Sequence, residues 1–308
     1  MKRNQTTDDG QLGKVPLARS ALRNQLYPYW FLLPGLLLLG VFVLAPIVWG
    51  FVISLHDFDG LNPMEWRGLG NYRMIFNDPS FTSSISNTIV FAVIVVLGKN
   101  VAGLAVALLF TKTLRGMSVY RMASFLPLTL NIVVVGAFWT FFLQADRGLL
   151  NEGLRAIGLD QVAQAWLSDP TYALGTVAAV EIWRWLPLHV LLYLAGLNDL
   201  PSETHDAALV DGAKGYQRLL YVTVPMLRPV IFVNVLIALM GAFVRSFEMV
   251  WVLTRGGAGT NVMITNIYTE AFRFQRFGRA AAMSFVLLLI TAILSFAYVK
   301  LARGGRGD

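Results

Sequence analysis

Six long, mostly apolar stretches constrain what this chain of 308 residues can fold into. They lie at about 29–55, 86–110, 119–143, 171–196, 229–253 and 280–301. A helix rises ~1.5 Å per residue, so roughly 20 apolar residues are enough to cross the hydrocarbon core of a bilayer. Charged residues make up only 14% of the chain, whereas about a quarter is usual in soluble domains. The sequence therefore predicts an all-α membrane protein with six transmembrane helices.

The basic residues around these stretches indicate their orientation. Lys and Arg are more frequent in the two tails and the even-numbered connections than in the odd-numbered connections, although residues 254–279 carry four arginines. Because basic residues are retained on the cytoplasmic side, we expect both termini and the connection at 197–228 to be cytoplasmic. The predicted organisation is a cytoplasmic tail over 1–28, a six-span domain over 29–301 and a cytoplasmic tail over 302–308.

The composition also excludes several classes of function. The net charge is +7, but the basic residues flank apolar stretches and form no stripe with interleaved aromatic residues, so we expect no nucleic-acid binding. The chain has no cysteine, its three histidines lie in different segments, and it has no catalytic or nucleotide-binding motif. We therefore expect no catalytic residue, no metal site and no ATP hydrolysis. A secondary transporter or channel driven by an ion gradient is the alternative that composition alone allows.

Two long connections, at 56–85 and 144–170, carry helix signals. Asp78, followed by Pro79 and Ser80, is typical of a turn that begins a helix. Leu150 and Leu154 have helical spacing within the second connection. These patterns favour short amphipathic helices at the outer surface, and ordinary exposed loops are the alternative.

The connection at 197–228 has the signals of a short helix that ends sharply. Ser202 can cap the start of this helix, and Glu203 and Asp206 then fall in its first turn, where negative charge is favourable. Gly212 can end the helix in a left-handed conformation. A compact helical unit of this kind transmits force as a rigid body, and a helical hairpin without a special role is the alternative.

The residues after Gly212 predict a second helix. Asp211 can cap this helix, which then runs to Pro225. Ala207 and Ala208 are small, so another protein surface could approach the first helix closely.

The same connection resembles the coupling loop of permease subunits of bacterial ABC importers. Asp206-Ala207-Ala208, then Val210-Asp211-Gly212-Ala213 and the pair Pro225 and Pro229, match the Glu-Ala-Ala pattern of that family, with Asp206 in place of Glu. In the family this loop docks onto a separate ATPase. The residues to which the resemblance gives this coupling role are Glu203, Asp206, Ala207, Ala208, Asp211, Gly212, Ala213 and Pro225.

Shorter motifs extend the resemblance over nearly the whole chain. They are similar to motifs of carbohydrate-uptake permeases, and most similar to the first permease of oligosaccharide and glycerol-phosphate systems. The motifs are Gly68-Leu69-Gly70-Asn71-Tyr72, Gly148-Leu149-Leu150-Asn151, Trp183 with Pro187, Thr254-Arg255-Gly256-Gly257, and Phe277-Gly278. One departure is Ala258, which stands where the family has a proline after Gly-Gly.

The resemblance implies a transmembrane subunit of an ATP-driven importer in the bacterial inner membrane. It would translocate a sugar, an oligosaccharide or a related polyol or glycerol-phosphate solute by alternating access. The implied partners are a second homologous permease, a dimer of ATPase subunits that binds ATP and Mg, an extracytoplasmic solute-binding protein and membrane lipid. This chain itself would bind no cofactor.

Five charged residues lie inside the apolar stretches, where charge is costly: Lys99, Glu181, Arg184, Arg245 and Glu248. Glu181 and Arg184 are three residues apart, as are Arg245 and Glu248, so each pair could neutralise itself along one helix face. Lys99 has no local partner, and it could pair with another helix or with a second subunit.

The resemblance also gives these helices a role in substrate passage. In the family, substrate-lining residues surround the Trp-x-x-x-Pro segment and the helix face before Thr-x-Gly-Gly. Carried over, these residues are Arg184, Trp185, Leu188, Phe243 and Ser246. An aromatic ring and a guanidinium group suit a hydroxyl-rich or anionic ligand. Packing against lipid or other helices is the alternative for Trp185.

Overall fold

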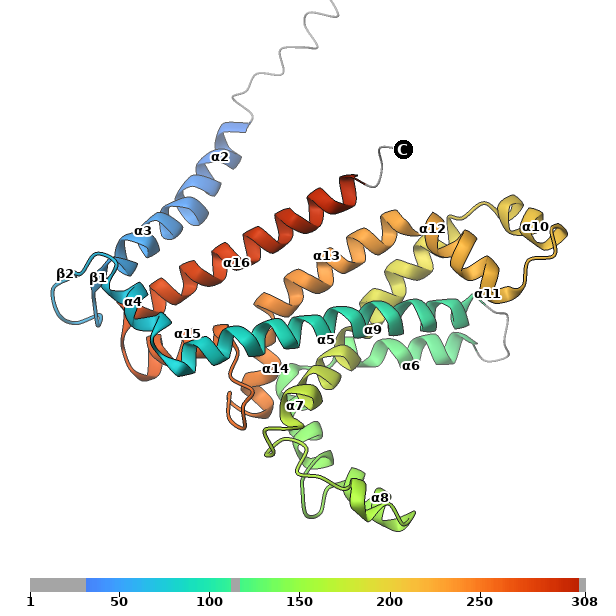
Figure 1. Ribbon diagram of the computed structural model, residues 1–308, viewed down its shortest axis with the longest axis horizontal. Coiled ribbons are helices and arrows are strands. Elements are labelled where there is room, and N and C mark those ends of the chain that lie inside the picture. The colour runs from blue at the N-terminus through green and yellow to red at the C-terminus, as the bar shows by residue number, and fades with distance from the viewer. Residues whose placement is uncertain (1–31, 112–116, 305–308) are drawn as a thin grey trace, which may run out of the picture. The chain divides into compact units, whose positions relative to one another are not determined.

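The computed structural model describes residues 32–111 and 117–304, which are mostly helical (Figure 1). The chain divides into two units, residues 1–50 and 51–308. The predicted tail over 1–28 lies outside the described residues, as do the last four residues of the predicted tail over 302–308.

The first apolar stretch forms a helix that begins in the first unit. It consists of α2 (Leu33–Leu39), the π-helical turn η2 (Gly40–Leu44) and α3 (Ala45–Ser54). Pro34 stands in the first turn of α2, where its missing N–H has no intrahelical partner to lose. The helix has no charged residue and is apolar on all sides, which is typical of a membrane span.

The second unit contains the other helices and one short sheet. The sheet pairs β1 (His56–Asp57) with β2 (Glu65–Trp66) in antiparallel register, His56 opposite Trp66. The helical elements are α4 (Gly70–Phe76), α5 (Pro79–Phe110), α6 (Met117–Thr129), α7 (Ile132–Phe142), α8 (Leu149–Ala156), η3 (Asp160–Val162), α9 (Ala173–Asn198), α10 (Ser202–Val210), α11 (Gly215–Arg218), η4 (Leu219–Thr223), α12 (Val224–Met226), α13 (Arg228–Val244), α14 (Ser246–Leu253), α15 (Met263–Tyr268), η5 (Thr269–Arg273) and α16 (Phe277–Gly304).

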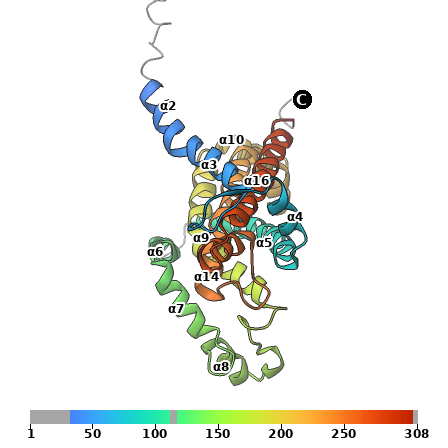
Figure 2. The same ribbon diagram turned by 90° about the vertical axis from the view of Figure 1, so that its left-hand side faces the viewer.

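Within the described residues, four helices are long and apolar enough to cross a membrane alone, and two bent helix pairs bring the count to at most six. The prediction of one continuous helix over 119–143 is wrong, because α6 and α7 meet at 106°. Pro127 lies inside α6 near its end, and the side chain of Asn131 accepts a hydrogen bond from the Val133 N–H at 2.9 Å, which starts α7 as a new helix. In both views α6 and α7 lead to α8 (Figures 1 and 2).

The fifth predicted span, 229–253, is also interrupted. Helix α13 ends at Val244, and α14 begins at Ser246. The Glu248 N–H donates to the Arg245 carbonyl at 3.2 Å, a bond over three residues instead of four, and it marks the break in the α-helical ladder. At its other end, α13 is bent by 73° from the preceding helical segment, and Pro229 stands in its first turn.

The helix signals in the two long connections are confirmed. The Asp78 carboxylate accepts a hydrogen bond from the Ser80 N–H at 2.9 Å and caps α5. The connection at 144–170 contains α8 and is ordered around Asn151, a buried residue whose amide bonds to the carbonyls of Ala145 and Gln164 and accepts from Trp166 Nε1 at 2.8 Å. An ordinary exposed loop does not describe this segment.

The core lies where α5 packs on α9 and on α13. Its buried residues include Phe91 and Val95 of α5, Val177 of α9 and Met249 of α14. Gly98 allows the close approach of α5 and α9, because a Cβ atom there would collide with the Ile182 side chain. Small residues serve the same purpose at helix interfaces in membranes generally.

The connections gather at two ends of the helices. At one end, here called the loop end, Arg279 bridges Asp78 at 2.9 Å and Glu270 at 3.6 Å. The Asn87 amide there donates to the carbonyls of Gly259 and Asn261 at 2.8 and 3.0 Å. Helix α5 runs from this end to α11, so α10 and α11 lie at the opposite end, here called the knob end (Figure 1).

Candidate functional site

The connection at 197–228 forms a helical knob, residues 202–226. Helix α10 begins at Ser202 with Pro201 as its N-cap, and no side chain caps it. The predicted Ser202 cap is therefore wrong: Pro201 supplies the extended backbone that starts the helix, so Ser202 is already inside it. Glu203 lies in the first turn as predicted, but Asp206 lies beyond it.

The end of α10 is closed by a pair of backbone hydrogen bonds. Gly212 has a φ of +75°, which confirms the predicted left-handed conformation. The Ala213 N–H donates to the Ala208 carbonyl and the Gly212 N–H to the Leu209 carbonyl, both at 3.0 Å. This is the Schellman arrangement, in which the left-handed residue satisfies the last carbonyls of a helix. It fixes the direction in which the chain leaves α10.

The second half of the knob is helical up to Pro225, as predicted, and one turn of it is a π-helix. The predicted Asp211 cap is wrong, because the left-handed turn separates Asp211 from the next helix, whose N-cap is Lys214. The Lys214 N–H is satisfied by Gln217 Oε1 at 2.7 Å.

The knob exposes apolar side chains on a polar segment. Val210 is 88% exposed and Tyr221 is 76% exposed, and Leu209 and Tyr216 are also exposed. Glu203, Asp206 and Ala207 are exposed on α10, and Ala208 and Ala213 are half-buried. Exposed apolar residues gathered on one polar segment are typical of a protein–protein contact.

A second group of functional candidates lies within the helices. The Lys99 Nζ atom of α5 lies 2.8 Å from Glu181 Oε1 of α9, and both side chains are buried. Two partners were possible for Lys99, another helix or a second subunit, and its pairing with another helix is confirmed. The Glu181–Arg184 pair is not formed, since Lys99 reaches Glu181 directly from the facing helix.

Arg245 lies at the break between α13 and α14 and stacks on Trp185 of α9. Its guanidinium carbon is 4.2 Å from the centre of the indole ring, while Lys99 Nζ is 6.0 Å from the same centre. The predicted Arg245–Glu248 pair is absent from the salt bridges of the described residues, and Glu248 is exposed. Sequence reasoning did not connect the Trp185 ring with Arg245.

The structure divides the five predicted substrate-lining residues into two sets. Arg184, Trp185 and Leu188 are half-buried on α9. Phe243 is 2% exposed and Ser246 is fully buried. Phe243 belongs to the core cluster and also lines an apolar groove of about 220 Å³ with residues of α13 and α16.

Two buried hydrogen bonds next to this region were missed by sequence reasoning. His189 Nδ1 of α9 lies 2.5 Å from Asn234 Oδ1 of α13, and the Tyr193 hydroxyl donates to Asn100 Oδ1 of α5 at 2.6 Å. The polar residues in these apolar stretches are the only signal that could have indicated them. Together they tie α9 to both of its neighbours.

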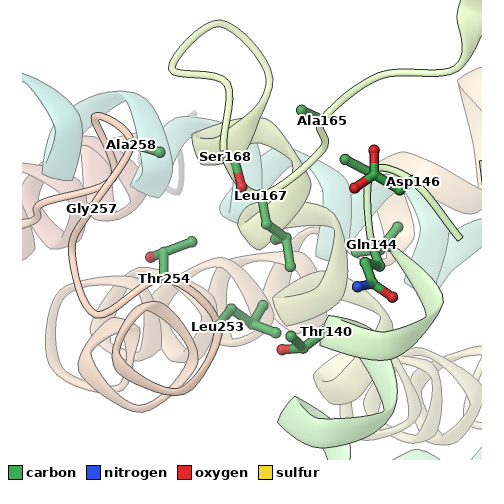
Figure 3. A pocket seen from close by; sticks show the side chains of 12 residues that line it. Thr140, Gln144, Asp146, Ala165, Leu167, Ser168, Leu253, Thr254, Gly257 and Ala258 are labelled. Atoms are coloured by element: carbon green, nitrogen blue, oxygen red, sulfur yellow. The ribbon is translucent and has the colours of Figure 1, made fainter. Parts of the chain in front are cut away.

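A cleft of about 630 Å³ lies near the end of α7. Figure 3 shows its lining, which comes from α7 and the residues after it, from residues 165–168 and from the end of α14 with the following loop. The polar groups around it are the side chains of Thr140, Gln144, Asp146, Ser168 and Thr254. Hydroxyl, amide and carboxylate groups of this kind can bond to a hydroxyl-rich ligand.

In the loop after α14, Ala258 stands where the resembled pattern has a proline. Ala258 has a φ of +49°, whereas the proline ring fixes φ near −65°. A proline could not occupy this conformation, so the replacement of the family's proline by alanine changes the shape that this loop can take. Among the described residues, no group of His, Asp or Glu side chains could hold a metal ion.

Comparisons with known proteins agree over most of the chain. Residues 99–306 match the family model described as binding-protein-dependent transport system inner membrane component. The probable ABC transporter permease protein YurN of Bacillus subtilis is 35% identical over 291 residues, which cover 93% of this chain and 99% of that protein. The lactose transport system permease protein LacF of Rhizobium radiobacter is 31% identical, with 93% and 98% covered.

The fold is shared with a solved structure. A chain of a bacterial alginate ABC transporter, in complex with an alginate pentasaccharide-bound periplasmic protein, superposes with a TM-score of 0.79. The match covers 95% of this chain and 99% of that chain at 22% sequence identity. This chain therefore belongs to the family of binding-protein-dependent transport system inner membrane components, and it is a permease subunit of an ABC importer.

Proposed function

We propose that this chain forms half of the passage by which a sugar or oligosaccharide enters the cell. The observation that carries the proposal is the family match over residues 99–306, which includes the whole knob. Similar permeases are named for the transport of lactose, of trehalose and maltose, and of arabinooligosaccharides. ATP hydrolysis in such systems belongs to a separate subunit.

The knob is proposed as the site where an ATPase docks. Its exposed Val210 and Tyr221 offer apolar contacts, and the turn at Gly212 holds α10 in a fixed shape. The knob also connects α9, which ends at Asn198, directly to α13, which begins at Arg228. A force on the knob would therefore reach the helices that carry Trp185 and Arg245 without passing through a long loop.

The remaining partners follow from the same proposal. A second homologous permease would complete the passage, two ATPase subunits would bind ATP and Mg, and an extracytoplasmic solute-binding protein would deliver the solute. The alginate transporter, which was solved together with a pentasaccharide-bound periplasmic protein, supports this mode of delivery. Both termini and the knob would be cytoplasmic, an orientation that the excess of Lys and Arg on that side supports.

The passage itself is proposed to run beside Arg184, Trp185 and Leu188, whose side chains are only partly buried. Phe243 and Ser246 would join it only if α13 and α14 move, because both are buried against other helices in this structure. The interruption of the helix at Arg245 supports this location, since transporters commonly place their substrate sites where a spanning helix is broken.

Reconstitution tests the proposal. The chain is purified with its second permease, ATPase and binding protein and placed in proteoliposomes, and uptake of radiolabelled sugars is measured with and without ATP. We expect uptake only with ATP and the binding protein. Uptake that follows an imposed ion gradient and ignores ATP would overturn the proposal in favour of a secondary transporter.

A further inference from the structure

The helices beside the proposed passage carry an excess of positive charge. Lys99, Arg184 and Arg245 bring three cations to α5, α9 and the α13–α14 break, and Glu181 is the one anion in contact with any of them among the described residues. Arg184 and Arg245 both lie within electrostatic range of Glu181. Because Lys99 already neutralises Glu181, the two guanidinium groups leave a net charge of about +2 inside the helix layer.

The two arginines have hydrogen-bond donors without acceptors. Nε and Nη1 of Arg184 and Nε of Arg245 are buried, and none has a partner in the described part of the chain. Buried donors that stay unsatisfied are costly, and the cost rises when the group is charged. A second chemical group is therefore expected to meet these donors in the working protein.

Trp185 restricts the position of the Arg245 guanidinium group. The guanidinium carbon of Arg245 lies over the indole, 4.2 Å from the ring centre, and its Nε–H has no acceptor among the described residues. Stacking thus holds a planar fork of donors in place without using them. Such a fork matches a carboxylate or a phosphate, whose two oxygens accept parallel N–H bonds.

The same residues are buried only in part, although their free donors are shielded from solvent in this structure. Arg184, Trp185 and Arg245 are half-buried, so this chain leaves part of the cluster uncovered. Next to them, the Ser246 hydroxyl is fully buried and has no hydrogen-bond partner among the described residues. The cluster also lies at the break of a spanning helix, a place where transported solutes are bound in other transporters.

We propose that the solute carried by this importer bears an anionic group, a carboxylate or a phosphate, which Arg184 and Arg245 bind during passage. The proposal rests on the proposed function and narrows its substrate class from sugars in general to acidic or phosphorylated ones. Lys99 pairs with Glu181 and joins α5 to α9 beside the two arginines, and Trp185 positions Arg245.

Three probes of different charge test the inference in the reconstituted importer with its own binding protein. They are maltotriose, which is neutral, trigalacturonate, which has the same number of sugar units and carries carboxylates, and glycerol 3-phosphate. We expect ATP-driven uptake of one anionic probe at least tenfold faster than uptake of maltotriose. Which of the two is imported distinguishes a carboxylate from a phosphate.

Variants of the two arginines then test whether these residues cause the preference for an anionic probe. Arg184→Gln and Arg245→Gln should each raise the KM for the anionic probe about tenfold or more, while Arg184→Lys, which keeps the charge, should recover part of the loss. Arg73→Gln is the matched control, because Arg73 is an exposed arginine on α4 and should leave uptake unchanged. A merely structural role for the arginines would lower the amount of assembled complex and leave KM unaltered.

Each other outcome overturns the inference. ATP-driven uptake of maltotriose at a rate equal to or above that of both anions, unaffected by the arginine variants, would leave the importer function standing and remove the anionic solute. Loss of the second permease from the purified Arg184→Gln or Arg245→Gln complex would assign the free donors to a carboxylate of that subunit. ATP-driven uptake of a neutral sugar in the reconstitution above, with no uptake of either anionic probe, would likewise remove the anionic solute and leave the importer function standing.

Discussion

Lys99 on α5 donates a hydrogen bond of 2.8 Å to Glu181 on α9, and the two residues are 82 positions apart in the sequence. Both side chains are almost fully shielded from solvent. Removing one member of such a pair leaves the other charge buried without a partner, whereas replacing both with apolar residues is often nearly neutral. The pair therefore specifies how α5 and α9 face each other.

Lys99→Met should destabilise the protein by about 3–5 kcal/mol, because Glu181 would remain buried and unpaired. The double variant Lys99→Met with Glu181→Leu should recover most of this loss. The midpoint of thermal unfolding of the purified permease in detergent measures both effects. A double variant less stable than either single variant would show that the charges stabilise the fold by more than their mutual pairing.

Gly212→Pro should uncouple transport from the ATPase. Proline fixes φ near −65°, and Gly212 has a φ of +75°, so the turn that closes α10 could not form. Asp206→Lys should have a similar effect by reversing the charge on the exposed face of α10. The measurements are uptake and co-purification of the ATPase.

Gly212→Asn is the control for this experiment, since asparagine tolerates the left-handed conformation better than other residues. It should retain most of the uptake, and all three variants should still insert in the membrane. Normal ATPase binding by Gly212→Pro and Asp206→Lys would mean that the knob is not the docking site.

Ala258→Gly should stabilise the permease by about 1 kcal/mol, because Ala258 has a φ of +49°, a region that costs an L-residue energy and a glycine almost none. Ala258→Pro should have the opposite effect, since proline cannot adopt this φ. Thermal unfolding midpoints of the two variants check the sign of each change. If Ala258→Pro stabilised the protein instead, residue 258 would have to adopt a φ near −65° in the membrane.

Cysteine labelling should place the knob on the cytoplasmic side. The chain has no cysteine, so a single one can be introduced at Lys214 in the knob or at Leu61, which is 85% exposed at the loop end. An impermeant thiol reagent added to right-side-out vesicles should label the Leu61→Cys variant at once and the Lys214→Cys variant only after permeabilisation. Labelling in the reverse order would invert the proposed topology.

Local rules were sufficient for the end of α10 and for the start of α5. A left-handed glycine and an Asp-Pro-Ser start are decided by backbone preferences within four or five residues, so Gly212 and Asp78 could be interpreted without a structure. The helix starts at Ser202 and Lys214 were misplaced because several residues near each start have the chemistry of a cap. Only the backbone geometry selects one of them.

Hydropathy was less reliable inside the apolar stretches. It counts apolar residues and does not respond to the bend at Asn131 or to the interruption of the helix at Arg245. The Lys99–Glu181 and Arg245–Trp185 contacts depend on which faces of separate helices meet. Spacing along one helix predicted instead that Arg184 would pair with Glu181 and Glu248 with Arg245, and neither pair is among the salt bridges of the described residues.

The bridge from Arg279 to Asp78 and Glu270 would act as a pivot for the helices if the knob is the docking site. It ties the first residues of α5 and α16 together at the end opposite to the knob. A rod that is held at one end and pushed at the other rotates, and the displacement of each point grows with its distance from the pivot. Lys99 lies about 30 Å along α5 from Pro79, well over half of the helix. If the ATPase docks on the knob as proposed, a push there would displace the charged cluster much further than the loop end.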